Sequence, residues 1–469
     1  MKLEQIYTGC LAVGTYYIES KGEAIIIDPL REVEPYLKKL EEDGVKLKYI
    51  FETHFHADFV SGHVDLARKT GATIVYGPTA TAGYDIHVGT DGEVFKIGDI
   101  ELKLMHTPGH TLESSSWVLT DEKGKQTAIF TGDALFIGDV GRPDLAIKAG
   151  AITEEDLAGM LFDSLRNKIM LLPDDIIVYP NHGAGSACGK NMSDETFDTL
   201  GNQKKTNYAL RADMTKEEFI KEVLTGLTAP PQYFPKNAMM NKTGYESIDA
   251  IYERGEVALS PSQFEEVAKA NDALILDTRD AQVFKDGFVP NSINIGLEGD
   301  FAPWIGALII DMQQAIILIT EKGQEKESIT RLARVGYGNV LGFLDGGVAA
   351  WKDAGKKVDT IVSISAEELA QILDKEEVTV LDARKPNEYL SEHILVAENF
   401  PLDYINSNMN KLDKSKVYHI HCAGGYRSMI TASILKARGF NNIVDICGGF
   451  DAITETSVPK SDFVCPSTL

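Results

Sequence analysis

Histidine and aspartate side chains gather in four short segments of the N-terminal half, each just after a run typical of a β-strand. The segments are Thr53–Asp58, Thr107–His110, Phe130–Asp133 and Tyr179–His182. The loops that follow the strands of a rigid sheet can aim side chains at one point. A metal ion requires such convergence, because its nitrogen and oxygen ligands lie only about 2.0–2.2 Å from it. One such histidine alone is as often a hydrogen-bonded core residue, but four groups together predict a metal site.

Three other histidines of the N-terminal half, His63, His87 and His106, lie outside these segments. We expect them to be structural.

The segment His421–Ser428 carries a second candidate chemistry. It follows the strand-like run Lys416–Ile420 and precedes a helical pattern that continues to Lys436. Its glycines allow backbone N–H groups to turn inward around a sulfur atom, and such a nest at a helix N-terminus stabilises an anion. Cys422 is therefore predicted to be a reactive thiol.

The composition limits the partners of the chain. A length of 469 residues indicates about three domains, and 43% hydrophobic with 25% charged residues is typical of a globular protein. A net charge of −24 disfavours nucleic acids and anionic membrane surfaces. We therefore expect small-molecule partners.

Cysteine usage and the lack of long apolar runs predict a cytoplasmic protein. No apolar run has the length of a signal peptide or of a membrane span. Five cysteines, few and far apart, are not a disulfide framework. Cys447 and Cys465 lack a glycine cradle and an arginine, and we expect them to be structural.

The elements that must position the metal site form one layered α/β unit up to about Phe234. Short β-rich runs alternate there with loops and helical stretches. The runs are Ala24–Ile27, Lys48–Phe51, Glu101–Met105, Thr127–Phe130 and Ile176–Tyr179. Pro230–Pro235 then interrupts regular structure, and the polar stretch Lys236–Glu246 is predicted to be a linker.

The C-terminal half contains an internal repeat of about 105 residues. Leu274–Arg279 matches Thr379–Arg384, and the Gly-Gly pair Gly346–Gly347 matches Gly448–Gly449. Each copy mixes buried strand runs with helices, so two similar α/β domains are expected.

The motifs THFHAD, TPGH, FTGD and YPNHG of residues 1–235 resemble the metallo-β-lactamase fold in its glyoxalase II and persulfide dioxygenase branch. Members of that fold commonly bind two zinc ions through a T-H-x-H-x-D-H signature, whose last histidine belongs to the second metal. Phe59 occupies that place here and has no electron pair to donate, so we expect one metal ion.

The resemblance implies that His54, His110 and Asp133 bind one Fe(II), with Zn as the alternative metal. This 2-His-1-carboxylate triad leaves positions open for a sulfur substrate and for O2. His56, Asp58 and His182 become residues that orient bound ligands, or alternative metal ligands.

The turn Val140–Asp144 resembles the G-R-x-D segment of the same branch, which suggests that Arg142 clamps a carboxylate of the thiol substrate. A surface ion pair is an equal alternative for Arg142. Glutathione-using relatives carry His-Asp-Tyr and Asn-Pro-Arg steps, whereas this chain has His182-Gly183-Ala184 and Asn207-Tyr208-Ala209. Another low-molecular-weight thiol is therefore expected.

Residues 360–460 resemble a rhodanese, with the active loop C-x-x-G-x-R-S. The resemblance implies that Cys422 carries a persulfide and that Arg427 favours its anionic form. The persulfide cradle would consist of Ala423, Gly424, Gly425, Tyr426 and Ser428. The equivalent loop of the middle repeat, Ile319–Lys326, has no cysteine and resembles a pseudo-rhodanese that spaces or docks.

The fold class predicted from these resemblances is α/β multidomain, an αββα metallo-β-lactamase-like sandwich followed by two rhodanese-like α/β domains. The expected boundaries are 1–235 for the metal domain, 236–254 for a linker, 255–357 for the cysteine-less repeat and 358–469 for the rhodanese. This order is similar to that of bacterial persulfide dioxygenase–rhodanese fusions of sulfide detoxification.

The resemblance implies that a low-molecular-weight thiol persulfide and O2 give sulfite at Fe(II), and that the rhodanese joins sulfane sulfur to sulfite as thiosulfate. The chief alternative is a zinc-dependent thioester hydrolase of the glyoxalase II kind, which His56 favours as a third histidine ligand and Phe59 disfavours. A redox-sensing or sulfur-binding module is a non-enzymatic alternative, against which the intact ligand set argues. The direction of sulfur flow and a homo-oligomeric state stay open.

Overall fold

The computed structural model describes residues 1–146 and 151–465. The chain divides into two compact units, which are treated separately below. Unit 1 comprises Met1–Ile248 with Ala333–Gly336, and unit 2 comprises Asp249–Leu332 with Tyr337–Leu469.

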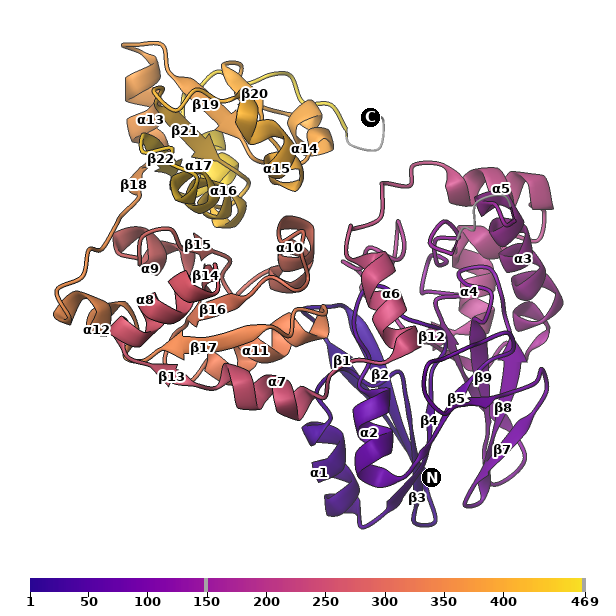
Figure 1. The fold of residues 1–469 in the computed structure, drawn as a ribbon. Coiled ribbons are helices and arrows are strands. Elements are labelled where there is room, and N and C mark those ends of the chain that lie inside the picture. Colours follow the sequence, from indigo (N-terminus) through magenta and orange to yellow (C-terminus); the bar gives the residue numbers. More distant parts are fainter. Residues whose placement is uncertain (147–150, 466–469) are drawn as a thin grey trace. The chain divides into compact units, whose positions relative to one another are not determined.

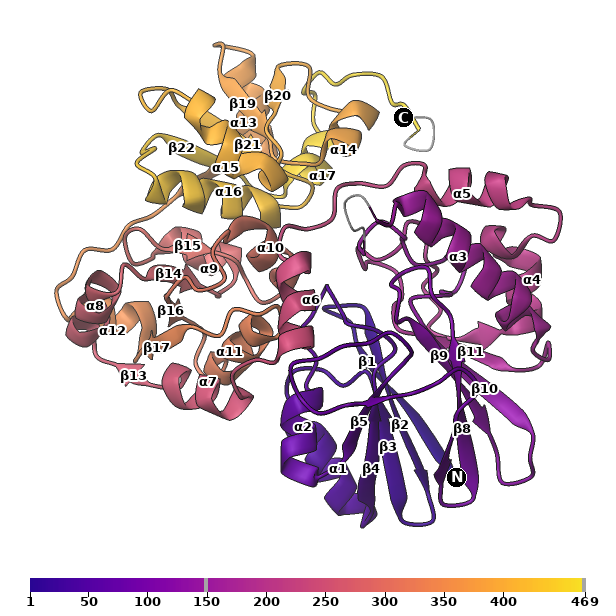
Figure 2. The ribbon, with the colours of Figure 1, turned by 45° about the vertical axis from the view of Figure 1, so that its right-hand side comes forward.

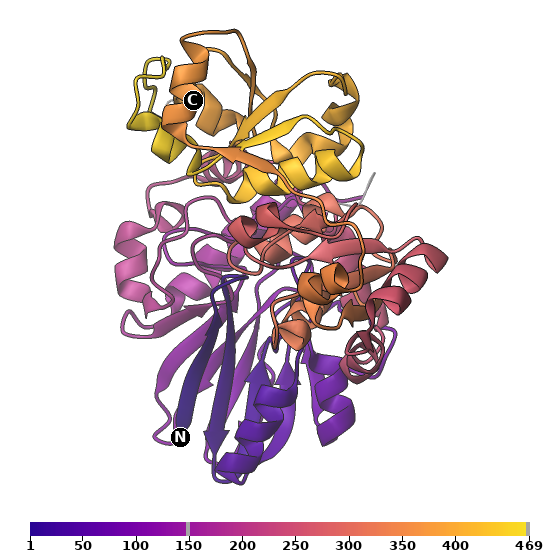
Figure 3. The same ribbon diagram turned by 90° about the vertical axis from the view of Figure 1, so that its left-hand side faces the viewer.

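Unit 1 contains two mixed six-stranded sheets (Figure 1). The first has the order β1 (Lys2–Thr8), β2 (Val13–Ser20), β3 (Glu23–Ile27), β4 (Lys46–Phe51), β5 (Thr73–Tyr76) and β6 (His87–Val88). The second has the order β12 (Asp198–Thr199), β11 (Ile177–Pro180), β10 (Gln126–Gly132), β9 (Ser115–Thr120), β8 (Ile100–His106) and β7 (Val94–Ile97). In Figure 3, β1 and β2 run side by side as an antiparallel pair beginning near the N-terminus.

The two sheets form the inner layers of an αββα sandwich, as the sequence predicts. Their shared core includes Ile25, Phe51, Trp117 and Phe130, all fully buried. Figure 2 shows helices on the outer side of each sheet. They are α1 (Glu34–Asp43) and α2 (His63–Thr70) on the first, and α3 (Glu154–Asn167), α4 (Leu200–Thr206) and α5 (Lys216–Leu224) on the side of the second. Short 3-10 turns lie at Ile169–Leu171 (η1) and Tyr208–Leu210 (η2).

All five strand runs predicted for unit 1 form strands, and four of them end where the predicted site residues begin. Thr53–Asp58 follows β4, Thr107–His110 follows β8, Asp133 follows β10, and His182 follows β11. The apolar residues of these strands are buried, which fixes the strand ends and hence the loops that follow.

The segment predicted to be a linker is instead mostly helical, as α6 (Phe234–Thr243) and α7 (Ile248–Gly255). Its polar composition has another cause, because two of its asparagines are buried in unit 1 and one of them, Asn241, is hydrogen-bonded there. Asn241 Nδ2 donates to the backbone oxygens of His56 and Phe59, each at 2.8 Å, and Asn237 is also fully buried. Helix α6 thus supports the loop that carries the predicted ligands.

Unit 2 contains two five-stranded sheets of the same strand order, which confirms the predicted repeat. The first repeat has the order β13 (Ala258–Leu259), β17 (Val340–Leu344), β16 (Ile316–Ile319), β14 (Leu274–Asp277) and β15 (Ile293–Asn294). The second has β18 (Val362–Ile364), β22 (Ile443–Ile446), β21 (Tyr418–His421), β19 (Thr379–Asp382) and β20 (Ala397–Asn399). All the pairings are parallel.

Helices connect the parallel strands of each repeat, and in Figure 3 they lie on both sides of the C-terminal sheet. The first repeat has α8 (Pro261–Ala270), α9 (Ala281–Asp286), α10 (Phe301–Leu308), α11 (Glu325–Arg334) and α12 (Gly347–Asp353). The second has α13 (Ala366–Leu373), α14 (Pro386–Ser391), α15 (Ile405–Asn408), α16 (Tyr426–Ala437) and α17 (Gly449–Thr454), with 3-10 turns η3 (Leu402–Tyr404) and η4 (Met409–Lys411).

The two repeats share a buried ion pair at the end of the equivalent strand. Arg279 binds the carboxylate of Asp277, and Arg384 binds Asp382 in the same way. Among the described residues, no helix has both the length and the apolar character needed to cross a membrane.

Candidate metal centre and thiol site

The structure brings His54, His110 and Asp133 together. One ligand atom of each lies within 4.8 Å of the others. The Nε2 atoms of His110 and His54 lie 3.4 Å and 4.0 Å from Asp133 Oδ2. All three side chains are buried. This is the 2-His-1-carboxylate arrangement expected from the sequence.

Hydrogen bonds to the outer ring nitrogens orient both histidines toward the aspartate. Nδ1 of His54 lies 3.0 Å from the hydroxyl of Thr53, which donates to Asp28 Oδ2. Nδ1 of His110 lies 2.8 Å from the backbone oxygen of Arg142. Partners of this kind hold a metal-binding imidazole in place and direct its other nitrogen to the ion.

The charge state of the group suits a cation. Burial, with His56 and His110 nearby, lowers the pKa of His54 well below its usual range, so that its ring is neutral. Neither carboxylate oxygen of Asp133 has a hydrogen-bond partner among the described residues, although both are buried. Leaving a buried carboxylate uncompensated is costly. A divalent metal ion bound by the three side chains would remove that cost, so the residues fit a metal.

His56 belongs to a different group. Its Nε2 lies 3.0 Å from Asp28 Oδ1 and 3.4 Å from Glu52 Oε2. Burial alone would lower the pKa of His56, but Asp28 and Glu52 raise it well above its usual range. Phe59, which replaces the expected second-metal histidine, stacks on the His56 ring at 4.4 Å between centroids. His56 Nδ1 has no hydrogen-bond partner among the described residues.

A second set of buried donors consists of Asp58, His182 and Cys188, again within 4.8 Å of one another. His182 Nε2 lies 3.5 Å from Asp58 Oδ2 and 3.6 Å from Asp133 Oδ2. Burial, with Asp58 and Asp133 nearby, raises the pKa of Cys188 well above its usual range. The sequence did not single out Cys188. It lies in the loop after β11, without the arginine and helix start that mark Cys422, and only the fold brings its thiol near Asp58 and His182.

Arg142 is buried, and its guanidinium is already engaged. Nε and an Nη of Arg142 each donate to Asp144 at 2.7 Å. The other contacts of the guanidinium are with the backbone oxygens of Ala187 and Thr228. The ion pair is therefore internal, whereas the sequence suggested either a surface pair or a substrate clamp. Arg142 contributes to the site through its backbone oxygen, which orients the His110 ring.

The histidines expected to be structural have partners of their own. His63 Nε2 lies 2.6 Å from the Tyr84 hydroxyl, His87 pairs with Glu93, and His106 bonds the backbone oxygen of Leu112.

In unit 2, Cys422 lies at the end of β21 and just before helix α16, and its side chain is buried. The N–H of Gly425 donates to Cys422 Sγ at 3.1 Å. Gly425 has φ 107°, a conformation that favours glycine. The loop is also held by Phe450 and Asp451, whose N–H groups donate to the backbone oxygens of Cys422 and Ala423. The backbone therefore forms part of the cradle predicted for a sulfur anion.

Arg427 and the cradle residue Ser428 contact acidic side chains. Arg427 makes a bidentate pair with Glu388, at 2.6 and 2.8 Å. Glu388 is the main cause that raises the pKa of Arg427. Ser428 donates to Asp445 at 2.7 Å. The arginine is thus fixed beside the loop by Glu388, which the sequence did not predict.

Both units of the chain match known protein families. The family model described as the metallo-beta-lactamase superfamily matches residues 8–182, and the rhodanese-like domain matches residues 260–354 and 365–456. Human persulfide dioxygenase ETHE1, mitochondrial, is 31% identical over 233 residues, which cover 49% of this chain and 82% of the human protein. The chain belongs to the metallo-beta-lactamase superfamily. Its C-terminal half consists of rhodanese-like domains.

A second similar protein and a crystal structure carry names other than persulfide dioxygenase. A hydroxyacylglutathione hydrolase of Rhodopseudomonas palustris is 31% identical over 42% of this chain and 80% of its own length. The crystal structure of a metallo-beta-lactamase from Staphylococcus aureus covers 73% of this chain and 98% of its own, with 31% identity and a TM-score of 0.63. The relatives thus include both a persulfide dioxygenase and a hydroxyacylglutathione hydrolase, and the metal donors must distinguish between them.

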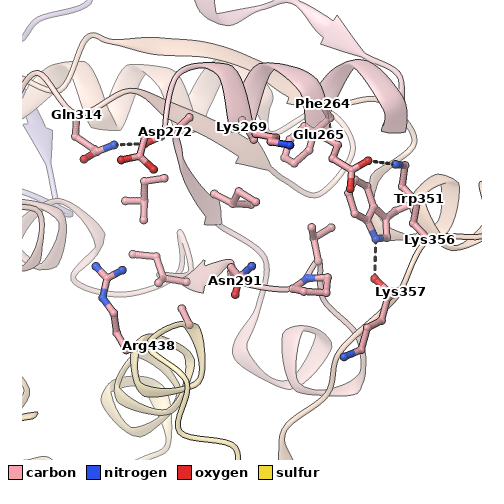
Figure 4. Close-up of a pocket in the computed structure, with 18 residues that line it drawn as sticks. Phe264, Glu265, Lys269, Asp272, Asn291, Gln314, Trp351, Lys356, Lys357 and Arg438 are labelled. Atoms are coloured by element: carbon pink, nitrogen blue, oxygen red, sulfur yellow. Dashed lines mark hydrogen bonds and ion pairs between the residues drawn. The ribbon is translucent and has the colours of Figure 1, made fainter.

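The superfamily site and the thiol loop do not use the large cavity of unit 2. This cavity, of about 740 Å³, is lined by residues that include Lys269, Asn291, Trp351 and Arg438 (Figure 4). None of its lining residues is a predicted site residue. In the cysteine-less repeat, residues 320–324 join β16 to α11 in place of the thiol loop.

Proposed function

We propose that the chain is a persulfide dioxygenase coupled to sulfur transfer by its second rhodanese-like domain. The observation that carries this proposal is the group formed by His54, His110 and Asp133, with His56 held apart by two carboxylates. Two imidazoles and one carboxylate would bind one face of an ion and leave other positions open, which suits a non-haem ferrous centre. The human relative named persulfide dioxygenase supports the same activity.

The oxidation balances without a further reductant. A thiol persulfide, RSSH, reacts with O2 and water to give the thiol RSH, sulfite and two protons. The sulfane sulfur is oxidised, O2 is reduced, and the S–S bond breaks. A ferrous ion bound by the triad would supply the O2 chemistry. The hydroxyl of Thr53 holds the His54 ring, and the backbone oxygen of Arg142 holds the His110 ring.

In the second step, Cys422 takes sulfane sulfur from a persulfide and gives it to sulfite. Its thiolate attacks the outer sulfur of RSSH, so RS⁻ leaves and Cys422 persulfide forms. Sulfite then attacks the outer sulfur of that persulfide, Cys422 leaves as a thiolate, and thiosulfate is the product. The Gly425 N–H at 3.1 Å from Cys422 Sγ stabilises the anionic sulfur in both steps. We expect these reactions to take place in the cytoplasm.

The first test is metal content. Protein produced with excess iron and freed of loosely bound metal is expected to hold about one iron per chain, because Phe59 supplies no ligand to a second iron. Elemental analysis by mass spectrometry measures this directly. Tight binding of two zinc ions and no iron would contradict the proposal.

A second candidate function is a zinc-dependent thioester hydrolase. It is favoured by the group of Asp58, His182 and Cys188, which offers a carboxylate, an imidazole and a thiol to a zinc ion. Thiolate and imidazole are good zinc ligands. Hydrolysis of S-lactoylglutathione by zinc-loaded protein, with one zinc lost in Cys188→Ser, would favour this function over the first.

Replacement of Arg427 by alanine is expected to slow thiosulfate formation by about 10-fold, while the Gly425 cradle still lets some persulfide form. Arg427→Lys serves as the matched control. It keeps the positive charge but loses the bidentate pair with Glu388. Its rate should therefore lie between the rates of the wild type and of Arg427→Ala. Thiosulfate measured by ion chromatography at saturating sulfite gives these rates. An unchanged rate in Arg427→Ala would remove this residue from the mechanism.

The thiol co-substrate is proposed to be a low-molecular-weight thiol other than glutathione. Asn207, which stands where glutathione-using relatives begin an Asn-Pro-Arg step, donates to the backbone oxygens of Phe136 and Asp139. A substrate clamp by Arg142 stays a prediction, and it would require the Asp144 pair to open.

A further inference from the structure

Within unit 2, the helix that follows the thiol loop is attached to the cysteine-less repeat. Tyr426 is the first residue of α16, and its hydroxyl donates to the backbone oxygen of Gly296 at 2.8 Å. Burial raises the pKa of Tyr426 above its usual range, so the hydroxyl keeps its proton and remains a donor at neutral pH. The acceptor belongs to the first repeat, 130 residues earlier in the chain.

Two glycines of a turn in the first repeat, Gly296 and Gly299, lie beside the aromatic ring of Tyr426. A Cβ atom at Gly299 would lie 3.1–3.4 Å from three ring atoms, and one at Gly296 would lie 3.6 Å from the ring. The turn itself is held in place. Arg331 donates to the backbone oxygen of Leu297 at 2.7 Å, and the Leu297 N–H donates to Thr278. Glycine at position 299 therefore leaves room for the Tyr426 ring, whereas the 3.6 Å at Gly296 is an ordinary contact distance.

A second attachment lies two turns further along the same helix. The N–H of Asn294, in β15, donates to the hydroxyl of Ser433 at 2.9 Å, and both groups are buried. Residues seven apart lie on one face of a helix. Tyr426 and Ser433 thus fix one face of α16 to the first repeat, which determines where the helix begins.

The start of α16 lies within the sulfur cradle. Gly425, whose N–H donates to Cys422 Sγ, immediately precedes Tyr426 and has φ 107°. The Gly425 N–H belongs to the peptide unit before Gly425, and only the two backbone dihedral angles of Gly425 separate it from the planar peptide unit that Gly425 shares with Tyr426. A shift of the Tyr426 backbone therefore reaches the Gly425 N–H through a single residue. The contact with Gly296 is therefore coupled to the sulfur atom through two residues.

We propose that the cysteine-less repeat positions the thiol loop, with its Gly296–Gly299 turn binding Tyr426 and so holding the Gly425 N–H against the Cys422 sulfur. Tyr426 is a positioning residue in this account. The inference rests on the proposed sulfur-transfer role of Cys422. The cysteine-less repeat then has a structural role in sulfur transfer, and the aromatic residue beside Arg427 is the part of the loop that the repeat binds.

The test is the pH profile of Cys422 alkylation in the full-length protein. Iodoacetamide reacts with the thiolate, and mass spectrometry of the Cys422 peptide gives the rate from pH 6 to pH 10. Tyr426→Phe keeps the ring and removes one hydrogen bond, so alkylation at pH 7 should slow by about 2- to 10-fold. At pH 10 the difference should shrink, since the thiolate then forms without help from the cradle. Gly299→Ala should act in the same direction from the other repeat.

Tyr337→Phe is the matched control. The Tyr337 hydroxyl donates to the backbone oxygen of Ile309, so the same group is removed within the cysteine-less repeat alone. It should leave the alkylation profile unchanged, while circular dichroism verifies that all variants are folded. Wild-type profiles for Tyr426→Phe and Gly299→Ala, or equal slowing by Tyr337→Phe, would overturn the inference. If wild-type Cys422 itself reacted no faster than exposed Cys447, the proposed sulfur-transfer role would fail instead.

Discussion

Cys422→Ser is expected to consume O2 with a persulfide but to accumulate sulfite in place of thiosulfate. Serine keeps the size of the side chain, yet its hydroxyl does not form a persulfide. The triad lies in unit 1 and Cys422 in unit 2, so the metal group should keep its structure. Thiosulfate should fall by more than about 100-fold. The products are separated by ion chromatography after O2 uptake stops.

Cys447→Ser is the control for this substitution. Cys447 is exposed, and its Sγ lies 3.9 Å from Gln282 Oε1. Its replacement should leave both O2 uptake and product identity unchanged. Thiosulfate production at the wild-type rate in Cys422→Ser would mean that the second rhodanese-like domain is not the sulfur acceptor, and the coupled mechanism would be wrong.

His110→Ala and Asp133→Ala are expected to abolish persulfide-dependent O2 uptake. Each removes one of the three proposed ligands, and even the loss of residues that only orient ligands typically costs about 10- to 100-fold. Activity below about one hundredth of wild type is therefore expected in protein reconstituted with ferrous iron. Metal content measured on the same samples should fall as well. Thiosulfate formation from added persulfide and sulfite should continue, since Cys422 is intact.

His106→Ala provides the matched control for His110→Ala. His106 lies four residues earlier, at the end of β8, and its ring bonds the backbone oxygen of Leu112 outside the triad. Its replacement should leave iron content and O2 uptake close to wild type. Normal uptake in an iron-reconstituted Asp133→Ala variant would show that the metal ligands have been assigned wrongly.

The triad could be predicted from the sequence because its parts follow strong strand signals. The apolar runs before Thr53, Thr107 and Asp133 are buried in one core, and that burial dictates where the loops begin. The repeat of unit 2 could be predicted for a similar reason, since the D-x-R step forms the same ion pair in both copies.

Other features depend on contacts that local sequence does not encode. Cys188 joins Asp58 and His182 only because a loop beyond β11 folds back over the strand ends. The polar stretch around Asn241 looked like a linker, but its amide is used inside unit 1. Glu388, the partner of Arg427, lies 39 residues away on another helix. Composition describes residue types, whereas these partners are set by tertiary packing.

The most direct test of the central claim is O2 consumption by iron-loaded protein on addition of a low-molecular-weight thiol persulfide. We expect that O2 is consumed one for one with the persulfide oxidised, that zinc-loaded protein does not consume O2, and that sulfite or thiosulfate forms at the same rate. Absence of O2 uptake by protein with a full complement of iron, together with rapid hydrolysis of a thioester by the zinc form, would contradict it.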